Sequence, residues 1–119
     1  MASKEDVIKA LSKILERLEL PSNKAIFASF TKTILFTFTD LQASFCIEIE
    51  NGVVKKLLEF SSERPDIIVS SDSNTFFDIV DNKLNPINAY STGKLKVQGS
   101  FLDLLKLQKL MRSTKPSLF

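Results

Sequence analysis

Residues 7–18 repeat apolar side chains at the three- and four-residue spacing of an amphipathic helix. The apolar positions are Val7, Ile8, Leu11, Ile14, Leu15 and Leu18. Ser3 and Asp6 stand where a capping box would begin this helix, and Pro21 is expected to end it. The polar face mixes acids with bases, so the pattern favours packing on a core over lying on a membrane. One or two further helical turns are expected within residues 22–30.

From Thr33 the apolar period changes to two, which is typical of strands with one buried face. Residues 34–38 and 45–49 predict two strands joined by a hairpin loop at 40–42. Asn51-Gly52 is the favoured pair for a type I′ turn into a third strand, 53–60. A fourth strand, 66–70, is apolar on both parities at its centre, so it should be covered on both faces there.

Residues 72–99 predict two short helices and a strand. Asp72 or Ser73 caps the first helix, and Asn82 stands where a left-handed residue would end it. Asn85-Pro86 is a helix start, and Gly93 ends the helix that follows. The alternation at 94–98 then indicates a fifth strand.

Ser100 is placed to cap a last helix, residues 101–111, which is apolar on nearly all sides. Phe101, Leu104, Leu105, Leu107 and Met111 form one arc, with Leu102 and Leu110 outside it and Gln108 inside it. Such a helix needs more than one apolar neighbour, either other helices or a bound ligand.

The order of these elements predicts an α+β fold with a single five-stranded, mainly antiparallel sheet and helices packed on one face. The 119 residues are enough for one domain, 1–119, and leave no room for a second. No apolar run approaches the length of a spanning helix, and the charged start does not resemble a signal peptide. A cytoplasmic protein is therefore expected.

Residues 83–110 contain a dense run of motifs. These are Lys83-Leu84-Asn85-Pro86, Ala89-Tyr90, Gly93-Lys94-Leu95-Lys96, Gly99, Lys106-Leu107-Gln108 and Leu110. In these motifs the chain resembles the sterol carrier protein type 2 family. The resemblance implies a non-enzymatic protein that binds sterols, fatty acids or acyl-CoA in an apolar tunnel between sheet and helices, with the last helix as one wall. The ligand-binding residues then expected are Phe76, Phe77, Ile79, Val80, Leu84, Ala89, Tyr90, Phe101, Leu102, Leu105 and Gln108.

Two details refine that expectation. Gln108, a polar group inside an apolar arc, either meets a ligand head group or satisfies buried backbone. Leu102 and Leu104 occupy positions where similar proteins often carry smaller residues, so a narrowed tunnel should prefer a linear acyl chain to a sterol. The ending Ser117-Leu118-Phe119 lacks the basic residue of a peroxisomal signal.

The composition argues against catalysis. The chain has no His, which removes Ser-His and Cys-His nucleophile systems and the commonest zinc ligand. Cys46 is the single cysteine and cannot form an internal disulfide. Glu48 with Glu50, and Asp78 with Asp81, read as solvated pairs. No enzyme activity, cofactor or metal is expected.

The net charge of +2 does not indicate a nucleic-acid partner, but the end of the chain is basic. From Lys94 onward there are six cations against Asp103. This segment could contact an anionic membrane, or it could be an ordinary solvated surface.

The sequence thus predicts a carrier of an apolar lipid. The alternative is an interaction module that docks on a lipid-metabolism enzyme or on its own twin. The oligomeric state is left open.

Overall fold

The computed structural model describes residues 2–59 and 64–111. Helix α1 (Lys4–Arg17) begins with the expected capping box, in which Ser3 Oγ accepts from the Asp6 N–H and Asp6 Oδ2 accepts from the Ser3 N–H. The expectation that Pro21 ends this helix is wrong. Helix α1 ends at Arg17, and Pro21 is the first residue of α2 (Pro21–Phe27), a position where its missing N–H leaves no bond unmade.

The sheet has five strands in the order β3-β2-β1-β4-β5. Their bounds are β1 (Lys32–Phe38), β2 (Ala43–Glu50), β3 (Val53–Glu59), β4 (Ile67–Ser71) and β5 (Lys96–Gln98). β1 and β4 are parallel, and the other neighbours are antiparallel, which confirms the predicted sheet. Phe60, the expected end of the third strand, lies outside the described residues.

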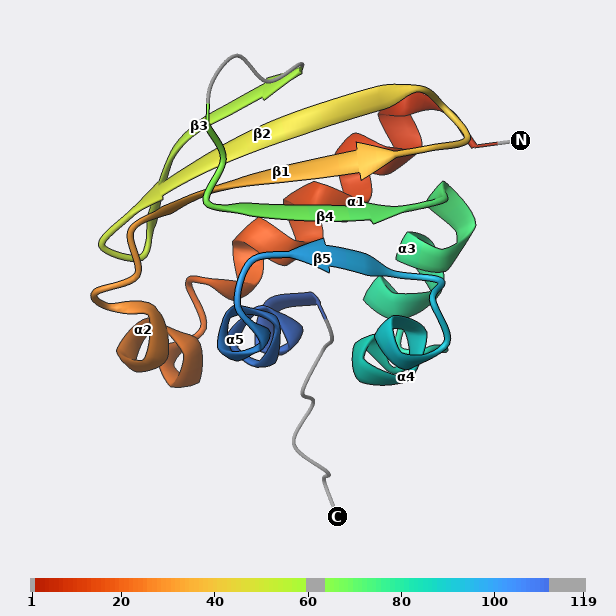
Figure 1. Cartoon of the computed structure of the whole chain (residues 1–119). Helices are drawn as coiled ribbons and strands as arrows, with labels where there is room; N and C mark the ends of the chain where they lie inside the picture. The colour runs from red at the N-terminus through yellow and green to blue at the C-terminus, as the bar shows by residue number, and fades with distance from the viewer. Residues whose placement is uncertain (1, 60–63, 112–119) are drawn as a thin grey trace.

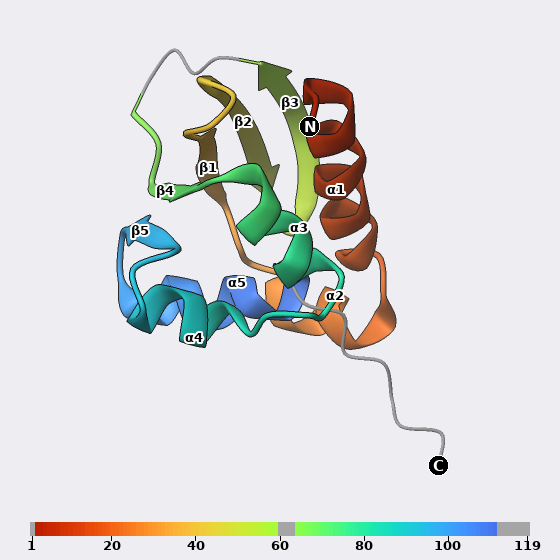
Figure 2. The same cartoon turned by 90° about the vertical axis from the view of Figure 1, so that its right-hand side faces the viewer.

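All five helices lie on one side of the sheet (Figures 1 and 2). Alternate strand residues face them and are buried, including Ile34, Phe36, Phe38, Phe45, Ile47 and Val69. The open face carries an apolar row in register across four strands, Leu58, Cys46, Leu35 and Ile68. Ile68 is only half-buried there, so β4 is not covered on both faces as expected.

The predicted caps of the remaining helices are confirmed. Helix α3 (Ser73–Val80) begins at Asp72, whose Oδ1 accepts from the Thr75 N–H at 2.7 Å. Helix α4 (Pro86–Ser91) begins at Asn85, whose Oδ1 accepts from the Ile87 N–H at 2.8 Å. Helix α5 (Phe101–Met111) begins beside Ser100, whose Oγ accepts from the Asp103 N–H at 3.1 Å. Within the described ranges, no helix combines the length and the apolar character needed to cross a membrane.

The turn between β2 and β3 needs glycine for two reasons. Asn51 and Gly52 have φ of 49° and 78°, as a type I′ turn requires. A β-carbon on Gly52 would also lie 2.6 Å from the carbonyl oxygen of Phe27. The turn therefore packs directly against the end of α2.

The arc predicted for α5 is wrong in detail. Leu104, Leu107, Leu110 and Met111 are buried, whereas Phe101 is 51% exposed. At 100° per residue Leu110 lies between Leu107 and the solvent side, so helical spacing alone placed the buried arc too far toward Phe101.

Asn82 ends α3 in the left-handed region, with φ of 64°. Asn82→Gly should have an unfolding free energy about 1 kcal/mol higher than Asn82→Ala, because both lose the side chain but only Ala places a β-carbon in this conformation. Urea unfolding of the two variants measures the difference. Equal stability would contradict a left-handed requirement at this position.

Candidate functional site

Four of the expected ligand residues on α3 and α4 lie in the core. Phe76, Ile79, Val80 and Ala89 are each at most 3% exposed. The Phe76 ring makes edge contacts with Phe36 and Phe38, at centroid distances of 5.7 and 5.1 Å. These rings fill the space beneath β1, and an internal tunnel is not seen among the described residues.

The other expected residues lie nearer the surface. Phe77, Leu84, Leu105 and Gln108 are half-buried. Tyr90, Phe101 and Leu102 are 39%, 51% and 74% exposed. The expected set thus separates into a buried group on α3 and α4, a half-buried group, and an exposed group on α4 and α5.

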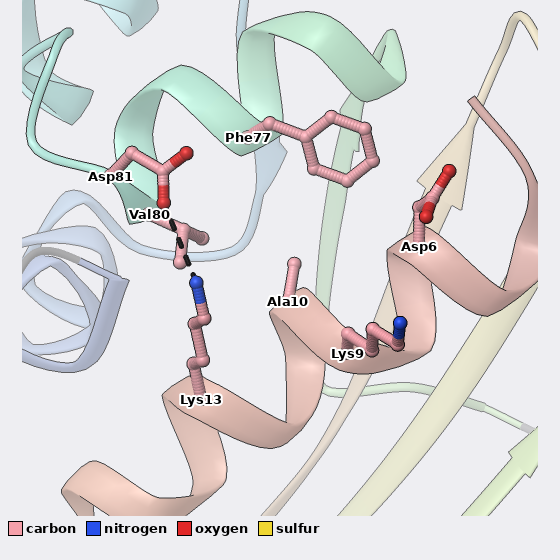
Figure 3. Close-up of a pocket in the computed structure, with 7 residues that line it drawn as sticks. All are labelled: Asp6, Lys9, Ala10, Lys13, Phe77, Val80 and Asp81. Atoms are coloured by element: carbon pink, nitrogen blue, oxygen red, sulfur yellow. Dashed lines mark ion pairs between the residues drawn. The ribbon is translucent and has the colours of Figure 1, made fainter. Parts of the chain in front are cut away.

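A groove of about 390 Å³ lies between α1 and α3 (Figure 3). Its lining residues are Asp6, Lys9, Ala10, Lys13, Phe77, Val80 and Asp81. The small side chain of Ala10 points from α1 toward Phe77 and Val80 of α3, so the floor of the groove is apolar. Phe77 and Val80 were predicted as ligand residues, whereas the α1 residues were not.

The rim of the groove holds both signs of charge. Lys13 Nζ lies 3.7 Å from Asp81 Oδ1 and bridges the two helices. The pKa of Asp6 is held below its usual value, first by the hydrogen bond from the Ser3 backbone N–H, so this carboxylate stays ionised near Lys9. With two cations and two acids, the rim has no net charge. The groove would therefore bind a ligand mainly through apolar contacts.

The N-terminal end of α3 is fixed by Asp40, in the loop between β1 and β2. Asp40 accepts from the Ser73 N–H at 2.9 Å and from the Ser73 hydroxyl at 2.5 Å. Burial acts to raise the pKa of Asp40, but the hydrogen bonds from Ser73 outweigh it and the pKa is lowered. The anion therefore also faces the positive end of the α3 dipole.

The C-terminal end of α3 is fixed by Arg17 of α1. Arg17 Nη2 donates to the Val80 carbonyl at 3.0 Å, and Nη1 donates to the Leu110 carbonyl of α5 at 2.8 Å. Burial lowers the pKa of Arg17, and Asp81 partly offsets this effect. This role of Arg17 was not predicted from the sequence, because a partner 63 or 93 residues away leaves no local signal.

Comparison with known proteins identifies the family of the chain. The SCP-2 sterol transfer family matches residues 11–112. The chain belongs to this family.

Some of the proteins that this chain resembles are much larger than it is. Over 77 residues the chain is 31% identical to peroxisomal multifunctional enzyme A of Dictyostelium discoideum, which covers 65% of this chain and 17% of that enzyme. The chain spans less than a fifth of the length of the curated relatives it matches.

Two solved structures of the family cover nearly the whole chain. The sterol carrier protein domain 2 of Helicoverpa armigera has a TM-score of 0.70 at 20% identity, over 92% of this chain and 90% of that one. Sterol carrier protein 2 of Aedes aegypti, solved with palmitate, has a TM-score of 0.68 at 22% identity, over 93% of this chain and 96% of that one. At these identities the likeness confirms the α+β fold.

The other candidate reactive groups are spread over the family fold. Cys46 is 7% exposed within β2, and Glu48 pairs in register with Lys56 of β3. Asp81 is engaged by Lys13. In residues 2–59 and 64–111, no three His, Cys, Asp or Glu side chains gather as a metal site.

Arg17→Met should lower the unfolding free energy by about 1–3 kcal/mol, because two buried helix-end carbonyls lose their donor. Lys13→Met is the matched control one turn earlier on the same helix. It breaks only an exposed ion pair and should cost less than about 1 kcal/mol. Denaturant unfolding compares the two, and equal losses would show that Arg17 contributes no more than a surface charge.

Proposed function

We propose that the chain is a non-enzymatic carrier of apolar lipids, formed by one domain over residues 1–119, with the α1–α3 groove as its lipid entrance. The observation that carries the proposal is the apolar floor of Ala10, Phe77 and Val80 within a groove of about 390 Å³. Small-ligand sites usually measure about 300–1,000 Å³ and are lined mainly by apolar side chains. Membership of a sterol transfer family and the palmitate held by the Aedes aegypti relative support the same class of ligand.

The apolar chain of the ligand is proposed to continue from the groove into the core as an internal tunnel. Phe77 lies at the groove, and Phe76 and Ile79 lie on the inner side of the same helix. Opening this path requires α1 and α3 to separate beside the groove, where the exposed Lys13–Asp81 pair opposes separation by about 1 kcal/mol or less.

The energy of such binding comes from the buried chain. Each methylene removed from water contributes roughly 0.8 kcal/mol. About ten of them reach the roughly 8 kcal/mol of a micromolar complex, and a longer chain offsets the cost of association. Apolar contact of this kind gives loose specificity among fatty acid and acyl-CoA chains.

Ala10→Leu should weaken palmitate binding by about tenfold or more, because the added atoms occupy the floor of the groove. Ala25→Leu is the matched control, since Ala25 is exposed on α2 and the same side chain is added away from the groove. Displacement of a fluorescent fatty acid measures both affinities. A thermal melt reports whether either variant is unfolded.

Unchanged binding by folded Ala10→Leu would remove the groove from the proposal. Loss of binding in both variants would point to a general effect of added bulk instead.

A linear ligand is proposed to bind better than a sterol, and Leu104 carries this preference. Leu104 is fully buried on the inner side of α5, whereas Leu102 is 74% exposed and cannot narrow an interior path. Palmitate should displace a fluorescent fatty acid at lower concentration than cholesterol does. Leu104→Ala should narrow that difference at a stability cost of about 2–5 kcal/mol, and Leu102→Ala should leave it unchanged. Equal displacement by the two lipids from the wild type would refute the preference.

A second candidate function is an accessory module of a lipid-metabolism enzyme. The observation that favours it is that the chain matches only a small part of the length of larger proteins, 17% in one and 10% in another. Native mass spectrometry of the purified protein separates the two candidates, since co-purified fatty acid supports the carrier and a ligand-free dimer supports the module. A cytoplasmic location remains part of the proposal.

A further inference from the structure

An exposed apolar patch lies where α4 meets the start of α5. It consists of Tyr90, Phe101 and Leu102, which are 39%, 51% and 74% exposed, and we call it the α4–α5 patch. The Tyr90 and Phe101 rings lie against each other, with centroids 6.0 Å apart. Both helices belong to the helical layer, and α5 lies beside β5 (Figure 1). The exposed fractions of the three side chains show that the patch is open to solvent.

The packing of α5 does not require these side chains. Leu104, Leu107, Leu110 and Met111 bury the inner side of the helix. Leu102 is two residues before Leu104, which turns it by about 200° to the outer side. Half-buried Leu105 and exposed Lys109 share that outer side. A leucine that is 74% exposed gains almost nothing from the fold, so its apolar surface is available to something outside it.

The chain segment that carries the patch is strongly basic. Residues 83–111 carry Lys83, Lys94, Lys96, Lys106 and Lys109 against the single acid Asp103. Lys32 Nζ lies 3.4 Å from Asp103, whose side chain is only 16% exposed. The whole chain carries +2, so the positive charge is concentrated in this segment. Asp66, whose backbone carbonyl lies beside Gly99, accepts a hydrogen bond from the Thr33 N–H at 2.8 Å.

Charge decides what covers the patch. A second copy would bring two basic surfaces together, and like charges across an interface are unfavourable. Residues 112–119 add Arg112 and Lys115 and no acid, so they offer no complementary charge. An anionic lipid surface supplies both an apolar layer for the aromatic and leucine side chains and negative head groups for the lysines.

We propose that the α4–α5 patch docks the protein on an anionic lipid bilayer, with Phe101 and Leu102 entering the interface and the lysines meeting the head groups. This goes beyond the carrier function, because a carrier can bind lipid without touching a membrane through a fixed surface. The lining residues of the α1–α3 groove all lie outside α4 and α5. Docking and lipid holding therefore use separate surfaces and can be disabled separately.

The test is co-sedimentation with vesicles of phosphatidylcholine containing phosphatidylserine, and with vesicles of phosphatidylcholine alone. The wild type should bind the anionic vesicles better, and added salt should weaken this binding. Leu102→Glu should lower binding by about tenfold or more, because it places an anion in the apolar patch. Leu58→Glu is the matched control, since Leu58 is 47% exposed on the open face of the sheet and takes the same change of charge.

A second pair of variants tests the charges. Lys94→Gln with Lys109→Gln should lower binding to anionic vesicles by about tenfold or more and make it less sensitive to salt. Lys55→Gln with Lys56→Gln removes the same charge from β3 and should have little effect. Palmitate binding without vesicles should be unchanged in all four variants, so loss of docking is distinguished from loss of the carrier function.

Three outcomes would overturn the proposal. One is equal binding to the two kinds of vesicle, and another is binding by Leu102→Glu as strong as that of Leu58→Glu. The third is a wild-type dimer in sedimentation equilibrium that Leu102→Glu dissociates, which would assign the patch to a second copy.

Discussion

The Arg17 guanidinium is the point at which the helical layer is joined. Arg17 belongs to α1 and donates to the last turns of α3 and α5, while Asn23 of α2 donates to the Arg17 carbonyl at 2.8 Å. The negative ends of two helix dipoles therefore converge on one cation that cannot deprotonate. The Lys13–Asp81 pair lies one turn earlier on α1, and the groove runs on from it toward Asp6. The hydrogen bonds of Arg17 thus hold α1 and α3 together at one end, so the two helices can separate only on the side of the groove.

Local signals in the sequence were sufficient for most of the fold. Ser3, Asp72, Asn85 and Ser100 each accept the hydrogen bonds expected of a cap. Caps and tight turns can be read in this way because their donors and acceptors lie within about four residues of each other. The family resemblance rested on residues 83–110, a segment that contains two of these caps, Asn85 and Ser100.

The site was harder to predict because its parts come together only through packing. Ala10 was not among the apolar positions predicted to repeat along the first helix, and the groove is lined where this small side chain meets Phe77 and Val80 of α3. The hydrophobic period alone also assigned Phe101 to the buried arc of α5 and excluded Leu110, whereas in the fold Leu110 is buried and Phe101 is 51% exposed. Long-range partners, such as those of Arg17, leave no trace in a local pattern.

The two edge strands determine how the sheet behaves among its own copies. β5 is only three residues long, so it offers little unpaired backbone to a neighbouring strand. β3 is longer, but it carries Lys55 and Lys56 and pairs with β2 through a register shift at Glu48–Ile49. Short edges, lysines and bulges are the features by which natural sheets avoid joining edge to edge. Both edges of the sheet therefore disfavour strand pairing between two copies, even though one face of the sheet is open.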